Sequence, residues 1–163
     1  MFKSIFLPII AVASFIIVVG LLSGGKLNFL IQTSPVKEKA KSIKIDSTEI
    51  NIEVAKTNDE RSKGLSNRTV LDEKTGMVFV FPKNSKPVFW MKDTKISLDI
   101  IWINDNKIIG IDKNVEPEPG VTDNKLKKYP SPSEIDYVLE VNSGFSDKYN
   151  IKPDQTISGL EQL

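Results

Sequence analysis

Alternating hydrophobic and polar residues mark the chain from residue 48 onward. Ile50, Ile52 and Val54 alternate with polar residues between 48 and 56, as in a half-buried strand. Other short runs are hydrophobic at almost every position, which is typical of strands buried on both faces. The pattern therefore predicts strands over 48–56, 76–81, 87–91, 98–103, 107–111, 135–141 and 156–160.

The helical signals are few and short. Thr57 and Glu60 have the spacing of a capping box, and Gly64 follows at a distance that suits the end of a short helix over 58–63. A second short helix is predicted over 143–150. About seven strands with one or two short helices indicate a mainly β fold, a single compact β-sandwich or a partly closed barrel.

A hydrophobic segment precedes this domain. Residues 5–22 read IFLPIIAVASFIIVVGLL, without a charge, which is long enough for a transmembrane helix. The sequence thus predicts three parts: a transmembrane signal anchor or signal peptide (1–25), a basic flexible tether (26–44) and the mainly β domain (45–163).

The sequence predicts less directly on which side of the membrane the domain lies. A short basic N-terminus before a hydrophobic run favours export, so we expect a membrane anchor with the domain on the extracytoplasmic side. The lysines of 26–44 oppose this orientation under the positive-inside rule. Small residues at Ser23, Gly24 and Gly25 leave the alternative of cleavage near Gly25 and secretion.

Composition narrows the chemistry. The chain has no Cys and no His, which excludes disulfides and histidine-dependent nucleophiles and makes zinc sites improbable; we expect no cofactor or metal. Oxygen-bearing residues over 112–123 resemble a calcium loop, but Pro117 occupies the position of the required Gly, so a solvated acidic loop is favoured. Residues 45–163 carry 16 Lys and Arg against 20 Asp and Glu, and no nucleic-acid partner is expected.

Several ordered motifs resemble one known family. In chain order they are EVAKTNDERSKGLSNR (53–68), GMVFVFP (76–82), VFWMKDT (88–94), LDIIWI (98–103), EPEPG (116–120), YPSP (129–132) and YVLEV (137–141). Over about 45–160 the chain resembles the bacterial and archaeal domain of unknown function 192. The resemblance implies a compact, mainly β domain behind an export signal and no particular reaction. One departure is Asp93, where the family usually has Asn.

Asp99 is the first candidate for a functional residue, because it is the single acid in the hydrophobic run Leu98–Ile103. A buried carboxylate must be paired or hydrogen-bonded. It either accepts backbone N–H bonds from the turn 93–97 as a structural group, or serves a site together with Lys92 or Arg68.

A second set of candidates surrounds the motif at 90–94. Trp90 and Lys92 share one face of a strand and Asp93 lies on the other, so an aromatic ring, a cation and the Thr94 hydroxyl suit a pocket for a sugar or a carboxylate. The alternative is a core Trp with Lys92 at the strand end. Further candidates for binding are Arg68, Tyr129 and Ser131.

Three functions remain open at this stage. The first is a non-catalytic accessory module that binds a small ligand, a glycan or a partner protein. The second is a hydrolase or transferase that depends on carboxylates and Lys92. The third is a structural envelope component that contacts another protein of the envelope. The absence of His and Cys favours the first.

Overall fold

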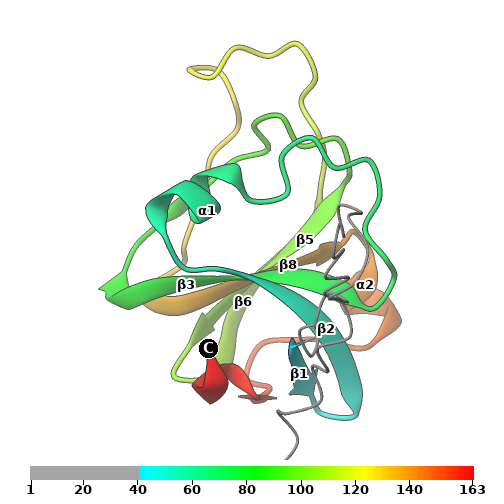
Figure 1. Ribbon diagram of the computed structural model, residues 1–163, viewed down its shortest axis with the longest axis vertical. Helices are drawn as coiled ribbons and strands as arrows, with labels where there is room; N and C mark the ends of the chain where they lie inside the picture. Colours follow the sequence, from blue (N-terminus) through cyan, green and yellow to red (C-terminus); the bar gives the residue numbers. More distant parts are fainter. Residues whose placement is uncertain (1–40) are drawn as a thin grey trace, which may run out of the picture. The chain divides into compact units, whose positions relative to one another are not determined.

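The computed structural model describes residues 41–163 (Figure 1). The predicted transmembrane segment at 5–22 and most of the predicted tether lie outside these residues. In chain order the elements are β1 (Lys41–Ile45), β2 (Thr48–Ala55), α1 (Asn58–Lys63), β3 (Thr75–Ser85), β4 (Val88–Phe89), β5 (Leu98–Asn104), β6 (Lys107–Val115), β7 (Tyr129–Pro130), β8 (Ile135–Asn142), α2 (Phe145–Lys148), β9 (Ile157–Ser158) and a 3-10 turn (Leu160–Gln162).

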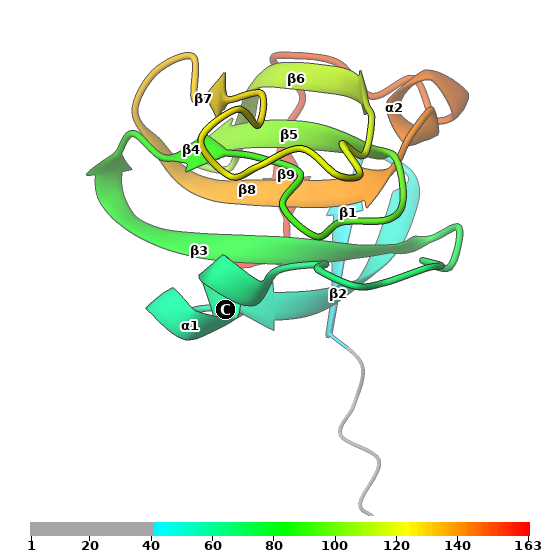
Figure 2. The ribbon, with the colours of Figure 1, turned by 90° about the horizontal axis from the view of Figure 1, so that it is seen from above.

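Seven strands form one sheet in the order β6-β5-β8-β3-β2-β1-β9, and β4 pairs with β7 in a small second sheet. β2 and β3 are parallel neighbours connected through α1, and the other pairs are antiparallel. The large sheet is strongly curled (Figure 2). Its two ends meet where Ile108 N donates to Gln155 O at 3.0 Å and Asp154 N donates to Ile108 O at 2.8 Å. The mainly β prediction is confirmed, as a curled half-barrel.

Local sequence signals explain several elements. Thr57 caps α1 and Glu60 bonds back to the backbone of Thr57, so the predicted capping box forms. Asp105 and Asn106 both have positive φ in the hairpin between β5 and β6, a backbone conformation that Asp and Asn adopt more readily than most residues. The element boundaries at these places agree with the sequence analysis.

Residues 41–44 differ from their prediction as tether. They form β1 with Ile45, and the side chains of Ile43 and Ile45 are buried while Lys44 is exposed. Both lysines of this strand, Lys41 and Lys44, are exposed, and β1 pairs with β2 on one side and β9 on the other. The composition of such a short strand resembles that of a basic linker. Among residues 41–163 no helix is long and hydrophobic enough to cross a membrane.

The two faces of the sheet carry separate hydrophobic clusters. The cluster inside the curl joins β1, β2, β8 and β9 and includes Ile43, Ile50, Leu139, Val141 and Ile157. The cluster on the other face includes Phe79, Trp102 and Val138, and it is covered by the chain that follows α1 and by β4 and β7. Strands β5 and β8 are therefore buried on both faces.

Asp99 of β5 lies on the face that curls inward and has no exposed surface. Its carboxylate accepts backbone N–H bonds from Asn114 at 3.0 Å, Gly144 at 3.2 Å and Ser146 at 2.9 Å. These donors come from the end of β6 and the start of α2, whereas the sequence analysis considered the turn 93–97. The carboxylate thus fixes α2 and the end of β6 against β5.

We expect Asp99→Ala to lower the free energy of unfolding by about 3 kcal/mol, because it leaves one buried and two partly buried N–H groups without an acceptor. Asp99→Asn keeps one oxygen but sets an amide NH₂ group against the N–H of Ser146, and we expect a loss of about 2 kcal/mol. Urea unfolding followed by tryptophan fluorescence measures both. Asp59→Asn, at an exposed position, is the control and should lower the free energy of unfolding by less than about 1 kcal/mol. If Asp99→Asn lowered it by no more than this control, the structural role of Asp99 would be contradicted.

Candidate functional site

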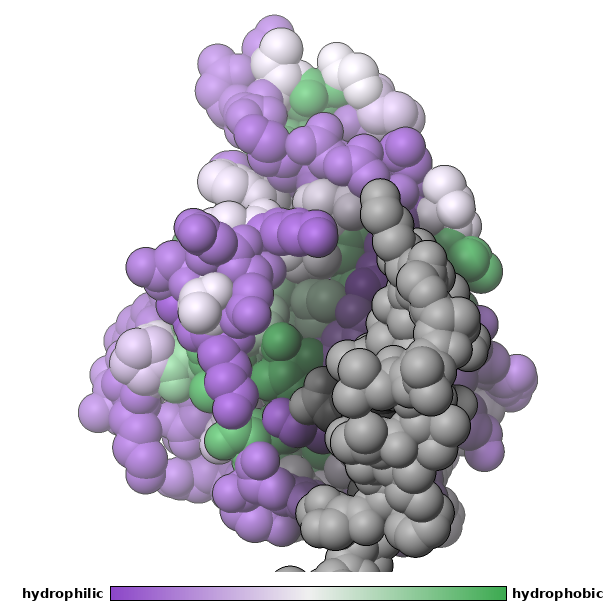
Figure 3. Space-filling view, in the orientation of Figure 1, coloured by the Kyte–Doolittle hydropathy of each residue, from purple (hydrophilic) through white to green (hydrophobic). Residues whose placement is uncertain are grey.

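A pocket of about 270 Å³ opens over the face of the sheet that is opposite the curl. One wall is α1 with the turn after it, from Asn58 to Ser66, and the other is the segment from Pro87 to Thr94. Side chains of the sheet form the floor. Figure 3 shows hydrophobic side chains in a recess beside the hydrophilic surface of α1.

Aromatic rings make the inner surface of the pocket. Phe89 contacts the edge of Phe79, with ring centroids 5.0 Å apart, and packs similarly on Phe81 at 6.1 Å and Trp102 at 5.5 Å. Trp90, which is 47% exposed, lies on the rim. The rings of Phe79, Phe81, Phe89 and Trp90 are four of the lining groups, so the pocket can accept a flat hydrophobic body.

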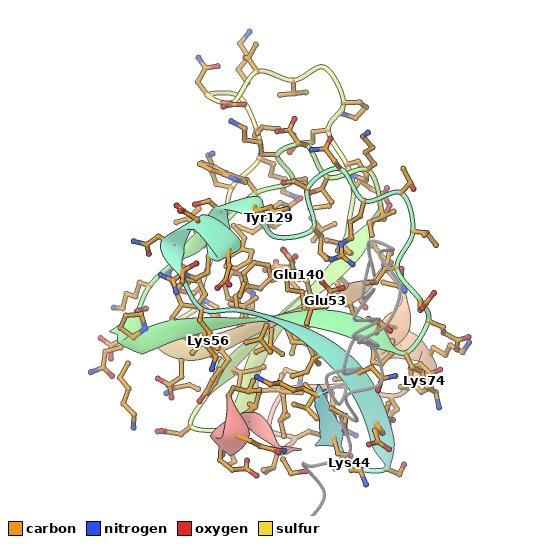
Figure 4. The ribbon with its side chains drawn as sticks, in the orientation of Figure 1. Lys44, Glu53, Lys56, Lys74, Tyr129 and Glu140 are labelled. Atoms are coloured by element: carbon orange, nitrogen blue, oxygen red, sulfur yellow. The ribbon has the colours of Figure 1, made fainter. Side chains whose placement is uncertain are left out.

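Among residues 41–163, Glu140 of β8 is the one acidic residue that lines this pocket. Its side chain lies on the sheet face toward α1 (Figure 4) and is only 5% exposed. Its strand neighbours in register are Met77 and Ile100, both hydrophobic. Within residues 41–163 no hydrogen bond or ion pair reaches its carboxyl group, and burial raises its pKa from an ordinary 4.5 to about 8. At neutral pH the group is therefore mainly a neutral carboxylic acid that can donate one hydrogen bond.

Other acidic side chains in the same row of the sheet have partners. Glu53, on β2, is in register with Met77 of β3, and its carboxylate accepts hydrogen bonds from both terminal guanidinium nitrogens of Arg68. At the far end of the row Asp112 accepts the indole N–H of Trp102 at 2.8 Å. Glu140 thus differs from its neighbours in having an unused carboxyl group that faces a pocket.

The charged groups on the pocket wall are cationic. They are Arg61 and Lys63 on α1 and Lys92 after β4. The guanidinium of Arg61 lies over the ring of Phe81 and donates to the neutral oxygens of Asn58, Lys56 and Val80. Its charge is therefore not neutralised by these bonds.

Lys92 has a different partner. Its ammonium pairs with the carboxylate of Asp123, and that hydrogen bond raises the pKa of Lys92. The backbone carbonyl of Lys92 also accepts the hydroxyls of Ser66 at 3.2 Å and Thr94 at 3.3 Å. The two pocket walls are further joined where Asn67 N donates to Asp93 O at 2.8 Å.

The structure brings only part of the predicted site together. Trp90, Lys92 and Thr94 line the pocket. Lys92, Asp93 and Thr94 also line a second hollow of about 200 Å³. Asp93 has φ of 56°, a conformation for which Asn and Asp are the favoured residues after Gly, so its exchange with Asn has a backbone explanation.

The remaining candidates lie elsewhere. Arg68 is held by Glu53, and Asp99 points into the opposite face of the sheet. Tyr129 on β7 is buried and pairs with Phe89, while the Ser131 hydroxyl is buried without a partner among the described residues. None of these four lines the pocket.

Sequence reasoning missed Glu140, although a usable signal was present. Glu140 is a lone acid in the hydrophobic run YVLEV, just as Asp99 is in LDIIWI. A lone acid in a hydrophobic strand is therefore the signal that marks both residues.

Comparisons with known proteins agree with the fold. The model of the family DUF192, described as an uncharacterized ACR, matches residues 41–159 and confirms the resemblance seen in the motifs. A crystal structure of a protein of unknown function from Novosphingobium aromaticivorans DSM 12444 is similar, with 30% identity, a TM-score of 0.65, and coverage of 77% of this chain and 89% of that one. No curated protein matches the sequence.

A second similar crystal structure comes from Sinorhizobium meliloti 1021 and is described as a candidate transcription regulator. It shares 26% identity and has a TM-score of 0.64, with 72% of this chain and 90% of that chain covered. Both similarities extend over most of the mainly β domain.

The burial of Glu140 predicts a pH dependence of stability. Between about pH 4.5 and 8 the unfolded chain loses a proton that the folded chain keeps, so the free energy of unfolding falls as pH rises through this window. Glu140→Gln should abolish this fall. The free energy of unfolding of the variant, relative to that of the wild type, should therefore rise by up to about 1.4 kcal/mol for each pH unit. Urea unfolding at pH 5, 6, 7 and 8 measures the difference.

The exposed Glu134→Gln serves as the control for removing one carboxyl group. A stability difference between wild type and Glu140→Gln that stays constant from pH 5 to 8 would contradict the raised pKa.

Proposed function

The chain belongs to the DUF192 family, and we propose that its domain is a non-catalytic small-molecule-binding module. The pocket over Glu140 carries the proposal. It combines the rings of Phe79, Phe81, Phe89 and Trp90 with the carboxyl group of Glu140 and with polar and cationic side chains on its walls, and aromatic surface together with a few polar groups is the usual composition of a ligand site. A carboxyl group buried without a partner is costly, and a ligand that hydrogen-bonds to it removes part of that cost.

The geometry favours binding over catalysis. The hydroxyls of Ser66 and Thr94 on the pocket wall donate to a backbone carbonyl, so neither is paired with a general base. Lys92 is held as a cation by Asp123, which opposes a role as a base or nucleophile. For these reasons the carboxylate-dependent hydrolase is the less favoured alternative.

The proposal includes a place at a membrane. Residues 5–22 would anchor the chain, with the domain on the extracytoplasmic side, or cleavage near Gly25 would release it. We propose no nucleic-acid partner, because the excess of acidic residues over 45–163 opposes contact with phosphates. The description of the Sinorhizobium meliloti protein is therefore not extended to this chain.

Ligand binding should require the pocket rim. In a fragment screen by NMR, we expect binders to shift backbone signals of residues 58–66 and 87–94. Trp90→Ala should weaken such binders at least fivefold, about 1 kcal/mol, since it removes one aromatic wall. Val70→Ala removes an exposed hydrophobic side chain that does not line the pocket and should leave affinity unchanged. Binders that shift other regions, or equal affinities for both variants, would contradict the site.

Membrane attachment is tested on the full chain. After carbonate extraction of cells that express it, we expect the protein in the membrane pellet, since a hydrophobic segment of this length resists extraction. Protease added to intact spheroplasts should digest the domain if it lies outside. A matched chain with Ile9, Val12, Phe15 and Val18 changed to Asp should not pellet with membranes. Retention of that variant in the pellet would contradict anchoring by residues 5–22.

A further inference from the structure

We propose that the ligand of this pocket is an organic anion with a flat hydrophobic body, such as an aromatic carboxylate, and that it binds while Glu140 carries its proton. This inference rests on the proposed binding function and specifies its ligand class. Three features of the pocket lead to it: its size, the sign of its charge and the depth of its single acid.

The size restricts the body of the ligand. The volume of about 270 Å³ lies just below the range of about 300–1,000 Å³ that is typical of ligand pockets, and it suits a molecule of one or two rings. Phe79, Phe81 and Phe89 supply faces and edges against which such a ring can pack.

The charge on the rim favours an anion. Arg61 is bonded to neutral oxygens, and no ion pair of Lys63 occurs among residues 41–163, so both retain an unbalanced positive charge. Lys128 adds a third cation, with its ammonium 3.5 Å from the ring centroid of Trp90. A carboxylate at the rim would thus lie among cations while its ring enters the pocket.

The other acidic groups near Glu140 do not line the pocket. On the same sheet face Glu53 is paired with Arg68, and Asp112, which accepts the neutral indole N–H of Trp102, lies outside the pocket lining. Asp136, which also lies on β8, accepts the N–H of Asp105. On the facing helix Arg61 and Lys63 line the pocket, whereas the acidic residues Asp59 and Glu60 do not. The opposite wall contributes Lys92, which is balanced by Asp123. The strands beside β8 present only Met77 and Ile100 in register with Glu140.

The burial of Glu140 determines its role in ligand binding. As a neutral acid it can donate its O–H to a hydroxyl, carbonyl or ring nitrogen on the inner end of the ligand. If it lost the proton, its negative charge would repel the anion. Affinity for an anion should consequently fall as the pH passes about 8, where burial places the pKa of Glu140.

The experiment uses matched acids, amides and amines on the same ring: phenylacetate, phenylacetamide and phenethylamine, and the indole series of indole-3-acetate, indole-3-acetamide and tryptamine. The full chain in lipid nanodiscs is titrated by calorimetry and NMR at pH 7 and pH 9. We expect at least one acid to bind with Kd below about 1 mM and at least tenfold tighter than its amide and amine. Its affinity should fall about tenfold from pH 7 to pH 9.

Two variants separate the parts of the proposal. Glu140→Gln keeps a neutral hydrogen-bonding group, so it should still bind the acid, with the same affinity at both pH values. Lys63→Ala should weaken the acid at least threefold and spare the amide, whereas Lys152→Ala, an exposed lysine away from the pocket, should change neither.

The outcomes distinguish this inference from the proposed function. An amine that binds most tightly, or an acid whose affinity is the same at pH 7 and pH 9 in the wild type, would overturn the anion proposal and leave a ligand pocket in place. If no compound of the series and no fragment binds at residues 58–66 and 87–94, both proposals fail.

Discussion

Burial of strands β5 and β8 on both faces is the constraint on which this domain depends. The hydrophobic side chains of these strands lie in one of two clusters, so a buried polar group on them must find a partner or remain uncharged. Two carboxyl groups meet this constraint in opposite ways. Asp99 is satisfied by three backbone N–H groups, while Glu140 is left as a buried acid that faces a pocket.

The pocket exists because the two faces of the sheet are covered differently. The curl closes one face around its own hydrophobic cluster, leaving little room between strands. The other face is covered by one short helix, a two-stranded sheet and irregular chain, which meet over Glu140 with a gap between them. A hydrogen bond from Asn67 N to Asp93 O links the two walls at one end of this gap.

Much of the fold followed from local patterns. The capping box at Thr57 and Glu60 and the hairpin at Asp105 and Asn106 were predictable because the residues that specify them are adjacent in sequence. Residues 41–44 were assigned to the tether because of their basic and polar composition, and only the pairing of β1 with β2 shows that they belong to the sheet. The sequence correctly predicted Trp90, Lys92 and Thr94 as pocket residues, because they lie close together along the chain.

By itself the sequence determined the mainly β class, the family and the existence of isolated acids within hydrophobic strands. Tertiary structure alone decided what those acids do. The donors to Asp99 lie 15, 45 and 47 residues away, and the walls over Glu140 come from 58–66 and 87–94. Whether a buried carboxyl is satisfied depends on the positions of such distant groups in three dimensions, and the pattern along one strand carries no information about them.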